Sequence, residues 1–380
     1  MKHQLTKNQF CLAGKGYEAT PAKSSSINKI CYTDPDFLAV EKQEVFEKTW
    51  QFVCHKEKLA EVGSYVTAEI QGQSIFVTRA DDGELKAFYN VCKHRAHELL
   101  SGEGKTKLIT CPYHAWVYKL DGSLFQVRRS EYIENFEQSK ICLTGIKLET
   151  FCHFVFVNLD PEAESLASQS GNLAKEIEQY APDIENLTFA KRLTYRIDAN
   201  WKAVVDNFLE CYHCPVAHTD FCSLIDMDTY KVKTQGIYSS HMAKAKVTDN
   251  SAYSIEGASV TDHAVWFLWP NMTLMRYPGR GNFMVWRFYP VSETQTHEVF
   301  DFFFESDEPN DSEQEAIQFI DDVLQPEDIA LVESVQRGMR TPAFEQGRFM
   351  VDPEGSGMSE HALHHFHGLI LDAYKKAVEN

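Results

Sequence analysis

Apolar and polar positions alternate with a period of two over two long regions of the chain. Between Gly63 and about residue 160, the runs SYVTAEI, QSIFVTRA and LKAFYNVC are separated by Gly72 and by the Asp-Asp-Gly turn at 81–83. Short β-rich runs bounded by turn residues predict a small antiparallel β domain. Over 229–305, longer runs such as AVWFLWPNMTLMRY and THEVFDFFF predict a larger antiparallel sheet.

Helical spacing of apolar residues appears in the remaining parts of the chain. We expect a short helix within 34–58, an acidic surface helix within 162–187, and long helices over 311–339 and 359–377. Residues 1–33 are polar and predict an arm with little structure. The sequence therefore predicts an all-β domain followed by an α+β domain whose sheet packs on helices.

Charge and composition exclude several classes of protein. The net charge of −18 argues against nucleic acid or an anionic membrane as a partner. Neither a signal segment nor a long apolar run is present, so we expect a soluble, cytoplasmic protein. The ten cysteines do not have the spacing of a disulfide framework. We expect some of them to be metal ligands and the others to be reduced, buried thiols.

The strongest local motif is a pair of mixed cysteine and histidine sequences. Cys92-Lys93-His94 is followed sixteen residues later by Cys111-Pro112-Tyr113-His114. Two thiolates and two imidazoles can hold a [2Fe–2S] cluster of the Rieske type. Zinc also accepts two cysteines with two histidines, but zinc fingers pair like with like and place the histidines on a helix. The mixed pairs in a β context therefore favour the iron–sulfur cluster over zinc.

A second motif, NFLECYHCPVAH, occupies residues 207–218. Glu210 and His213 are three residues apart, so a helix would present both on one face. Pro215 is expected to end that helix and to let His218 approach the same metal as His213. Two histidines with a distant carboxylate form the facial triad of non-haem Fe(II) oxygenases. Asp321, Asp322, Glu327 and Asp328 are the candidate carboxylates, and spacing alone does not choose among them.

Both motifs together resemble the α subunits of Rieske non-haem iron oxygenases, and the resemblance covers about residues 35–380. LVESVQRGM at 331–339, FEQGRF at 344–349 and HHFH at 364–367 resemble the branch containing choline monooxygenase and the glycine betaine and carnitine oxygenases. One departure is Ala115, where the family usually has glycine. The resemblance implies an N-terminal arm and helix over 1–44 that pack with the catalytic domain. It further implies a Rieske [2Fe–2S] domain over 45–158 and a catalytic domain of helix-grip (START-like) fold over 159–380.

The resemblance also assigns roles to individual residues. It implies that Cys92, His94, Cys111 and His114 bind the cluster, and that one mononuclear Fe(II) is bound by His213, His218 and Asp328. Glu210 would bridge His213 to His114 of a neighbouring subunit, and Asn207 would lie near the iron. Cys211 and Cys214 form a C-x-x-C pair, which we interpret as buried thiols without a metal role.

The implied function is hydroxylation of a small quaternary or methylated amine by O₂. Electrons from NAD(P)H would arrive through a separate flavin and iron–sulfur reductase, since no GxGxxG motif follows a strand here. The family assembles as a homotrimer. A quaternary ammonium group would be held by aromatic rings, for which Trp266, Trp269, Tyr277 and Trp286 are candidates. The alternatives are an aromatic-ring dioxygenase and a non-enzymatic electron carrier or ligand-binding module, in which the catalytic domain has lost its iron.

Overall fold

The structure is a computed structural model, and it describes residues 3–247 and 253–378. The chain divides into two compact units, one formed by residues 46–168 and the other by 1–45 together with 169–380. We call them the β unit and the catalytic unit. The expected boundaries lay at 44/45 and 158/159. Among the described residues, no helix is both long and apolar enough to span a membrane.

The β unit contains a seven-stranded antiparallel sheet of order β1-β10-β9-β4-β3-β2-β5 and a three-stranded sheet of order β6-β7-β8. Gln71 and Gly72, both with positive φ, form the tight turn between β2 and β3. At Gly122 an added Cβ would lie 2.5 Å from the ring of Phe88, so only glycine fits this turn. The strands are β1 (Gln51–His55), β2 (Ser64–Ile70), β3 (Gln73–Arg79), β4 (Leu85–Tyr89), β5 (Glu103–Lys105), β6 (Ile109–Thr110), β7 (Val117–Tyr118), β8 (Leu124–Gln126), β9 (Gly145–Phe151) and β10 (Phe154–Asn158).

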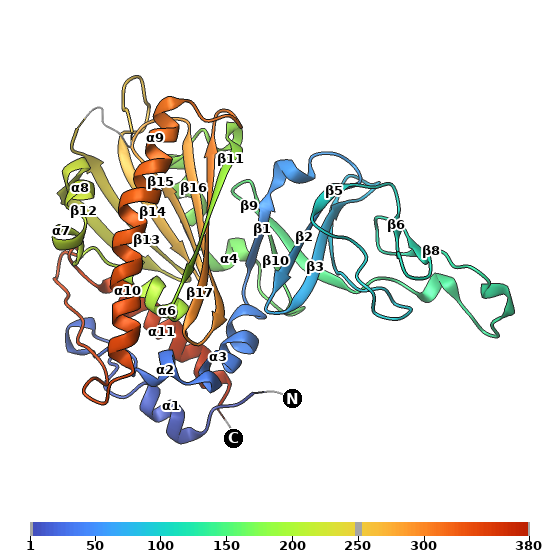
Figure 1. The fold of residues 1–380 in the computed structure, drawn as a ribbon, viewed down its shortest axis with the longest axis horizontal. Coiled ribbons are helices and arrows are strands. Elements are labelled where there is room, and N and C mark those ends of the chain that lie inside the picture. Colours follow the sequence, from blue (N-terminus) through green and yellow to red (C-terminus); the bar gives the residue numbers. More distant parts are fainter. Residues whose placement is uncertain (1–2, 248–252, 379–380) are drawn as a thin grey trace. The chain divides into compact units, whose positions relative to one another are not determined.

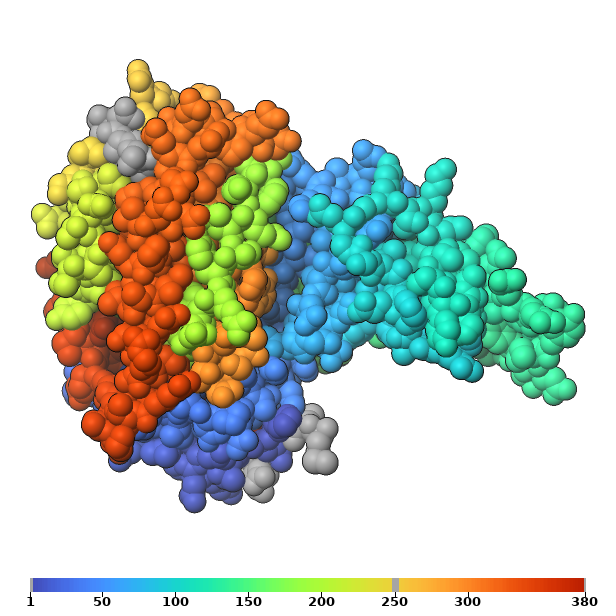
Figure 2. All heavy atoms as spheres, viewed as in Figure 1, coloured from blue at the N-terminus to red at the C-terminus, as the bar shows by residue number. Residues whose placement is uncertain are grey.

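The catalytic unit is built on a second seven-stranded antiparallel sheet, of order β11-β17-β16-β15-β14-β13-β12. Helix α6 packs on β16 and β17, and α10 packs on α6. Figure 1 shows α9 and α10 running in line along the sheet, and the same helices form the front of this unit in Figure 2. The strands are β11 (Thr188–Ile197), β12 (Ile225–Gln235), β13 (Tyr238–Ala245), β14 (Asp262–Leu268), β15 (Met272–Arg276), β16 (Asn282–Ser292) and β17 (Gln295–Phe304).

The helices of the catalytic unit come from both ends of the chain. The predicted helices over 311–339 and 359–377 are confirmed as a continuous α9–η7–α10 rod and as α11. The α+β organisation is therefore confirmed as well. The helices are α1 (Lys7–Ala13), α2 (Ile30–Thr33), α3 (Pro35–Glu41), α5 (Leu173–Tyr180), α6 (Trp201–Phe208), α7 (Cys214–Ala217), α8 (Thr219–Leu224), α9 (Asp311–Phe319), α10 (Gln325–Met339) and α11 (His361–Lys376), with a π-helical turn, η7 (Ile320–Leu324), inside the rod.

The prediction that residues 1–33 have little structure is wrong. Thr6 and Gln9 form a capping box that begins α1, and Leu5 pairs with Val378 in an isolated bridge. Leu5 and Ile27 are fully buried or nearly so. The polar composition hid these few anchoring residues, which are buried against the C-terminal part of the same unit.

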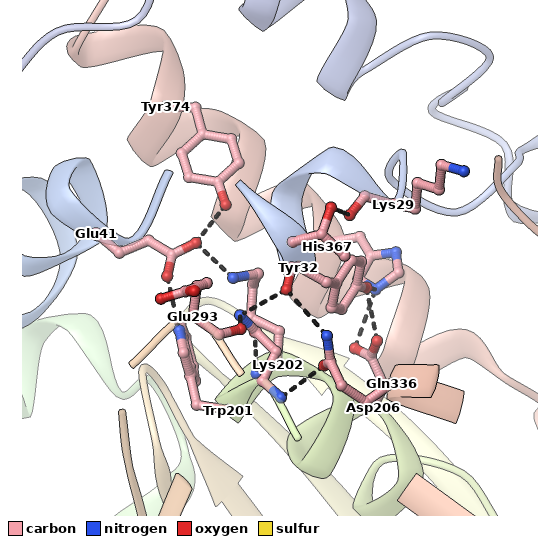
Figure 3. A network of polar contacts seen from close by, with 12 residues as sticks. Lys29, Tyr32, Glu41, Trp201, Lys202, Asp206, Glu293, Gln336, His367 and Tyr374 are labelled. Carbon is pink, nitrogen blue, oxygen red and sulfur yellow. Dashed lines mark hydrogen bonds and ion pairs between the residues drawn. The ribbon is translucent and has the colours of Figure 1, made fainter. Parts of the chain in front are cut away.

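A buried polar network joins α6 to neighbouring helices of the catalytic unit (Figure 3). The carboxylate of Glu41 accepts hydrogen bonds from Lys202 Nζ at 2.6 Å, Trp201 Nε1 at 2.7 Å and the hydroxyl of Tyr374. Lys202 and Glu41 are both completely buried. A buried ion pair is tolerated only when further hydrogen bonds satisfy it, as they do here. The network ties α3 and α11 to the first turn of α6.

The same network continues to Asp206, in the last turn of α6. Asp206 accepts hydrogen bonds from the Tyr32 hydroxyl at 2.6 Å and from His367 Nε2 at 3.0 Å. The backbone N–H of Ile27 donates to His367 Nδ1, which leaves Nε2 as the nitrogen that carries the proton. His367 is therefore a structural residue, and the network holds α6 at its first turn and at Asp206.

Candidate metal centres

The cysteine and histidine motif of the β unit forms two loops of the same construction. In the first, Cys92 N–H donates to His97 O and Ala96 N–H donates to Cys92 O. The second loop repeats both bonds, from Cys111 N–H to Trp116 O and from Ala115 N–H to Cys111 O. Each loop thus holds its cysteine in the same position, and the histidine follows two residues later in the first loop and three residues later in the second.

Ala96 and Ala115 occupy the same position of these two loops, and both have positive φ, 56° and 55°. A left-handed backbone costs a residue with a Cβ on the order of 1 kcal/mol, which glycine avoids. The departure from glycine at Ala115 therefore has a small conformational cost and leaves the backbone hydrogen bonds of the loop intact.

The four side chains face one another with the sulfur atoms inside. Cys92 and Cys111 are each 2% exposed and belong to one hydrophobic cluster, and Cys92 Sγ lies 3.3 Å from the hydroxyl of Tyr118. The rings of His94 and His114 lie 4.5 Å apart, and His94 is exposed. Desolvation and the nearby His94 and Arg95 lower the pKa of His114, which favours the neutral, ligating imidazole. Two buried thiols beneath two outward imidazoles fit a Rieske [2Fe–2S] cluster.

The second motif departs from the predicted helix. Helix α6 ends at Phe208, so Glu210 and His213 lie in the turn that follows it. Pro215 does not end a helix; it lies in the first turn of α7. Glu210 and His213 nevertheless meet, because the turn folds back and Glu210 Oε1 accepts a hydrogen bond from His213 Nδ1 at 2.5 Å. The Glu210 carboxylate also accepts the backbone N–H of His213, which stabilises the turn.

Three side chains meet above the end of α6. Asp328 Oδ1 lies 2.9 Å from His218 Nε2 and 3.7 Å from His213 Nε2, and the two imidazole rings lie 5.0 Å apart. The three donor atoms lie within 4.8 Å of one another, close enough to share one metal ion. Two imidazoles and one carboxylate match the donor set of mononuclear non-haem iron sites.

A carboxylate orients each of these two histidines by its contact with Nδ1, the ring nitrogen that faces away from Asp328. His218 Nδ1 lies 2.7 Å from Glu327 Oε2, as His213 Nδ1 lies near Glu210. Such contacts fix the tautomer and turn Nε2 toward the metal. Burial alone would lower the pKa of His218, but Asp328 and Glu327 outweigh it and raise the pKa to about 9. The carboxylates of Glu210, Glu327 and Asp328 thus surround the two imidazoles, an arrangement that favours a cation at this site.

The structure distinguishes the four candidate carboxylates. Asp321 accepts a hydrogen bond from the Tyr195 hydroxyl at 2.6 Å, and Asp322 accepts one from Gln318. Glu327 supports His218, which leaves Asp328 as the carboxylate beside both imidazoles. Asn207 Nδ2 lies 3.5 Å from His213 Nε2, at the edge of the same site.

Cys211 and Cys214 form a disulfide, so their interpretation as reduced thiols is wrong. Both are buried, and their positions on either side of His213 bring the two Cα atoms within 4.9 Å. The turn between α6 and α7 brings the two cysteines together, and the predicted helix does not continue through it. The disulfide closes a four-residue ring around His213.

A cavity of about 90 Å³ adjoins the three ligands, and we call it the inner cavity. Its described lining contains no lysine or arginine. His241 and His263 are buried, and desolvation lowers their pKa values to about 4 and about 3, so both imidazoles are neutral. The aromatic lining consists of Phe208, Phe221, Tyr230, Tyr277 and Trp286.

Trp266 and Trp269, two of the predicted aromatic residues, are not part of the lining of this cavity. Trp266 Nε1 donates to Glu176 of α5, and the ring of Trp269 lies 5.7 Å from that of Phe366 in α11. Strand alternation and the turn after β14 point these two rings elsewhere. Tyr277 and Trp286 line the inner cavity. The sequence reading missed Tyr230, His241 and His263, whose strands offered no signal beyond alternation.

Comparisons with known proteins agree with both centres. A Rieske [2Fe–2S] domain model matches residues 49–137, and a model of the ring hydroxylating alpha subunit catalytic domain matches residues 184–376. The carnitine monooxygenase oxygenase subunit of Escherichia coli (strain K12) is 42% identical over 359 residues, which cover 94% of this chain and 96% of the relative. The chloroplastic choline monooxygenase of Beta vulgaris is 32% identical over 92% of this chain and 77% of its own length.

Solved structures give the same picture. A quaternary ammonium Rieske monooxygenase in complex with L-carnitine has a TM-score of 0.85 and 34% identity, covering 94% of this chain and 98% of that one. Naphthalene 1,2-dioxygenase from Rhodococcus sp. has a TM-score of 0.80 at 18% identity, covering 97% and 98% of the two chains. At this low identity, the likeness to naphthalene 1,2-dioxygenase shows a shared fold and nothing more.

Proposed function

This chain belongs to the Rieske oxygenase α subunits, and from that premise we propose that it hydroxylates a small quaternary ammonium compound. The observation that carries the proposal is the lining of the inner cavity. Aromatic rings and neutral imidazoles surround it, a carboxylate lies at its base, and its described lining holds no cationic side chain. Aromatic faces attract a trimethylammonium group through cation–π interaction. The substrates of the carnitine and choline monooxygenase relatives are quaternary ammonium compounds of this kind.

The residues present fit both cofactors of the family. His213, His218 and Asp328 would hold the mononuclear iron, and Cys92, His94, Cys111 and His114 would hold the cluster. When bound, these groups supply the O₂ chemistry and the single-electron transfers of a hydroxylation. Overall, one C–H bond, O₂, two electrons and two protons become one C–OH bond and water. A hydroxyl placed on a carbon attached to nitrogen gives an unstable hemiaminal, which releases the amine and a carbonyl compound.

The protein's own contribution is orientation and exclusion of water. Glu210 and Glu327 fix the two imidazoles, and the ligands occupy one side of the site while the inner cavity occupies the other. A methyl or methylene group held by the aromatic wall would therefore face the reactive side. Desolvation raises the pKa of Tyr230 and of Tyr277, so both phenols stay neutral and add no charge to the cavity.

We propose that electrons from a second copy of the chain reach the mononuclear iron site by way of Glu210, which would act as a hydrogen-bonded bridge. Beside it, Tyr212 is 50% exposed and Val216 is 87% exposed, an apolar surface suited to being covered by protein. His94 and the half-exposed Tyr113 present a matching surface on the β unit. We propose that a histidine of one copy hydrogen-bonds Glu210 of the next, which implies a closed ring such as a trimer. The electrons would be supplied by a separate reductase.

A single-turnover experiment tests the activity. The fully loaded protein is reduced without oxygen, mixed with O₂, and offered L-carnitine, glycine betaine, choline and naphthalene in turn. Products are identified by mass, and carbonyl products are trapped. We expect oxidation of at least one quaternary ammonium compound and none of naphthalene, with Asp328→Asn as the inactive control. A cis-diol from naphthalene, with no reaction of any ammonium compound, would overturn the proposal.

A further inference from the structure

A second and larger cavity lies in the catalytic unit, between α9 and the adjoining ends of β16 and β17. It has a volume of about 370 Å³, and we call it the outer cavity. Its rim includes the exposed residues Glu256, Arg280, Glu305 and Ser312. Its floor is buried and formed by Tyr253, Tyr277, Met284, Phe302, Phe304 and Ile320. It therefore combines a charged opening with an aromatic base.

The outer cavity and the inner cavity are both lined by residues of the α9–η7–α10 rod and of the sheet. On the rod, residues spaced by four pass from Ser312, Ala316 and Ile320 in the outer cavity to Leu324 and Asp328 in the inner one. Such spacing keeps side chains on one face, and sixteen residues of helix span about 24 Å. The rod therefore contributes to both cavities, from Ser312 at the exposed rim of the outer one to Asp328 in the inner one.

The strand opposite the rod shows the same succession. On β16, Asn282 and Met284 line the outer cavity and Trp286 lines the inner one, and alternate residues of a strand share a face. Tyr277 lines both cavities, so its ring is their common wall. Its ring lies 6.4 Å from that of Tyr253 in a stacked arrangement. A molecule leaving the outer cavity toward the metal ligands would pass Tyr277.

The charge and the surface of the outer cavity suit one kind of occupant. Glu256, Glu305 and Glu313 line it, against a single arginine, Arg280, which is already paired with Glu305 at 3.3 Å. The balance is negative, and the floor offers four aromatic rings. Carboxylates at a rim raise the local concentration of cations, and aromatic faces bind a quaternary ammonium group without requiring hydrogen bonds.

We propose that the outer cavity is a second binding site for quaternary ammonium cations, from which the substrate passes Tyr277 into the inner cavity. The proposal rests on the proposed function, because it assumes that the inner cavity takes the same class of cation. It assigns a binding role to Glu256 and Glu313, neither of which is near the metal ligands in sequence or lines the inner cavity.

Calorimetric titration of the fully loaded protein with tetramethylammonium tests the proposal. We expect two sites, of which the double variant Glu256→Gln/Glu313→Gln weakens one by about fivefold and leaves the other unchanged. Glutamine at 313 preserves the capping box that Asn310 and residue 313 form at the start of α9. The matched control is Glu308→Gln/Glu315→Gln, which removes two exposed carboxylates of the same region that do not line the cavity.

A steric variant provides the second measurement. Ala316→Trp would fill the outer cavity from α9, and we expect it to abolish one tetramethylammonium site and to lower kcat/KM about tenfold with little change in kcat. The proposal of an outer site would be overturned if Glu256→Gln/Glu313→Gln and Ala316→Trp both kept two unchanged tetramethylammonium sites. It would also be overturned if the unmodified protein bound tetramethylammonium at one site alone. Failure of the proposed function looks different: then tetramethylammonium binds at neither cavity and no ammonium compound is oxidised.

Discussion

The two metal centres of this chain are assembled in opposite ways. The four proposed cluster ligands lie within 23 residues, on two loops with the same hydrogen bonds, and the histidines are at the surface of the β unit. The three proposed ligands of the other centre come from a turn, a helix end and a helix 110 residues away. They adjoin a cavity, and a buried polar network holds the helix α6 that precedes them in the chain.

This difference in assembly reflects the different requirements of electron exchange and of substrate binding. A cluster that exchanges electrons with partners needs a rigid, exposed tip, which short loops provide without support from elsewhere in the chain. A centre that binds substrate needs ligands on one side and a shaped cavity on the other, so its ligands must come from separate elements. The network of Glu41, Lys202 and Asp206 keeps the helix beneath that cavity in position. The following predictions test whether the two centres are as independent as this comparison implies.

Removal of one ligand at each centre should give the largest effect and the clearest separation. The intact protein should hold about three irons per chain, two in the cluster and one mononuclear. Asp328→Ala should lose one iron and keep the visible spectrum of the cluster, whereas His114→Ala should lose that spectrum and keep the mononuclear iron. Iron analysis and absorption spectra measure both. Loss of the cluster from Asp328→Ala would contradict the independence of the centres.

Lys202→Met should unfold the catalytic unit more readily while leaving the β unit unchanged. Removing Lys202 leaves the Glu41 carboxylate in a fully buried position, where an unpaired charge costs about 3–5 kcal/mol. Denaturant unfolding would be followed by tryptophan fluorescence, to which the catalytic unit contributes four of the six tryptophans, and by the cluster spectrum, which reports the β unit. The double variant Glu41→Leu/Lys202→Met should recover most of the loss. An equal shift of the two transitions would argue that the units unfold together.

Changes at Glu210 should slow transfer between the centres without emptying either. Glu210→Ala removes the acceptor that orients His213 Nδ1, and losing such a contact costs about 10–100-fold in activity. Glu210→Asp shortens the side chain and should have a smaller effect in the same direction. Rapid-mixing spectroscopy of cluster oxidation, with iron analysis as the control, measures this step. Loss of iron from Glu210→Ala would show instead that its role is to retain the metal.

The smallest expected effect concerns Glu360, at the start of α11. Desolvation first, then the nearby charges of Glu210 and Asp206, raise its pKa to about 7. The folded protein keeps this proton up to about pH 7, whereas the unfolded chain releases it above about pH 4.5. The free energy of unfolding therefore falls as the pH rises from about 4.5 to 7. Glu360→Gln should raise the free energy of unfolding by about 1 kcal/mol at pH 8 and not at pH 4. Equal effects at both pH values would contradict this origin.

The sequence predicted the cluster site better than the catalytic one, because the first is local. Cys92 to His114 can be interpreted from spacing and β context alone. Asp328 could not be separated from Asp321, Asp322 and Glu327 by spacing, since the choice depends on which residue faces α6 and which is bonded to Tyr195, Gln318 or His218. The aromatic wall was harder still, because Trp266 and Trp286 are equally apolar in sequence and lie on different faces of one sheet.

The fold was predictable where periodicity was strong. The strand at 64–70 and the long C-terminal helices follow their patterns closely. The turn at Glu210–His213 and the disulfide beside it were missed because both arise when α6 ends two residues before Glu210, a boundary for which the sequence gives no capping signal. The ordered N-terminal segment was missed because a few buried residues, such as Leu5 and Ile27, anchor a mostly polar stretch.

We propose that the two centres work together across copies of the chain, and mixed oligomers of two inactive variants test this cooperation. His114→Ala, which should lack the cluster, and Asp328→Ala, which should lack the mononuclear iron, are each expected to be inactive alone. Co-expressed with different tags and purified as mixed oligomers, they should recover a substantial fraction of the unmodified turnover, because some interfaces pair an intact cluster with an intact iron site. Mixed oligomers as inactive as the separate variants would show that the electrons pass within one chain.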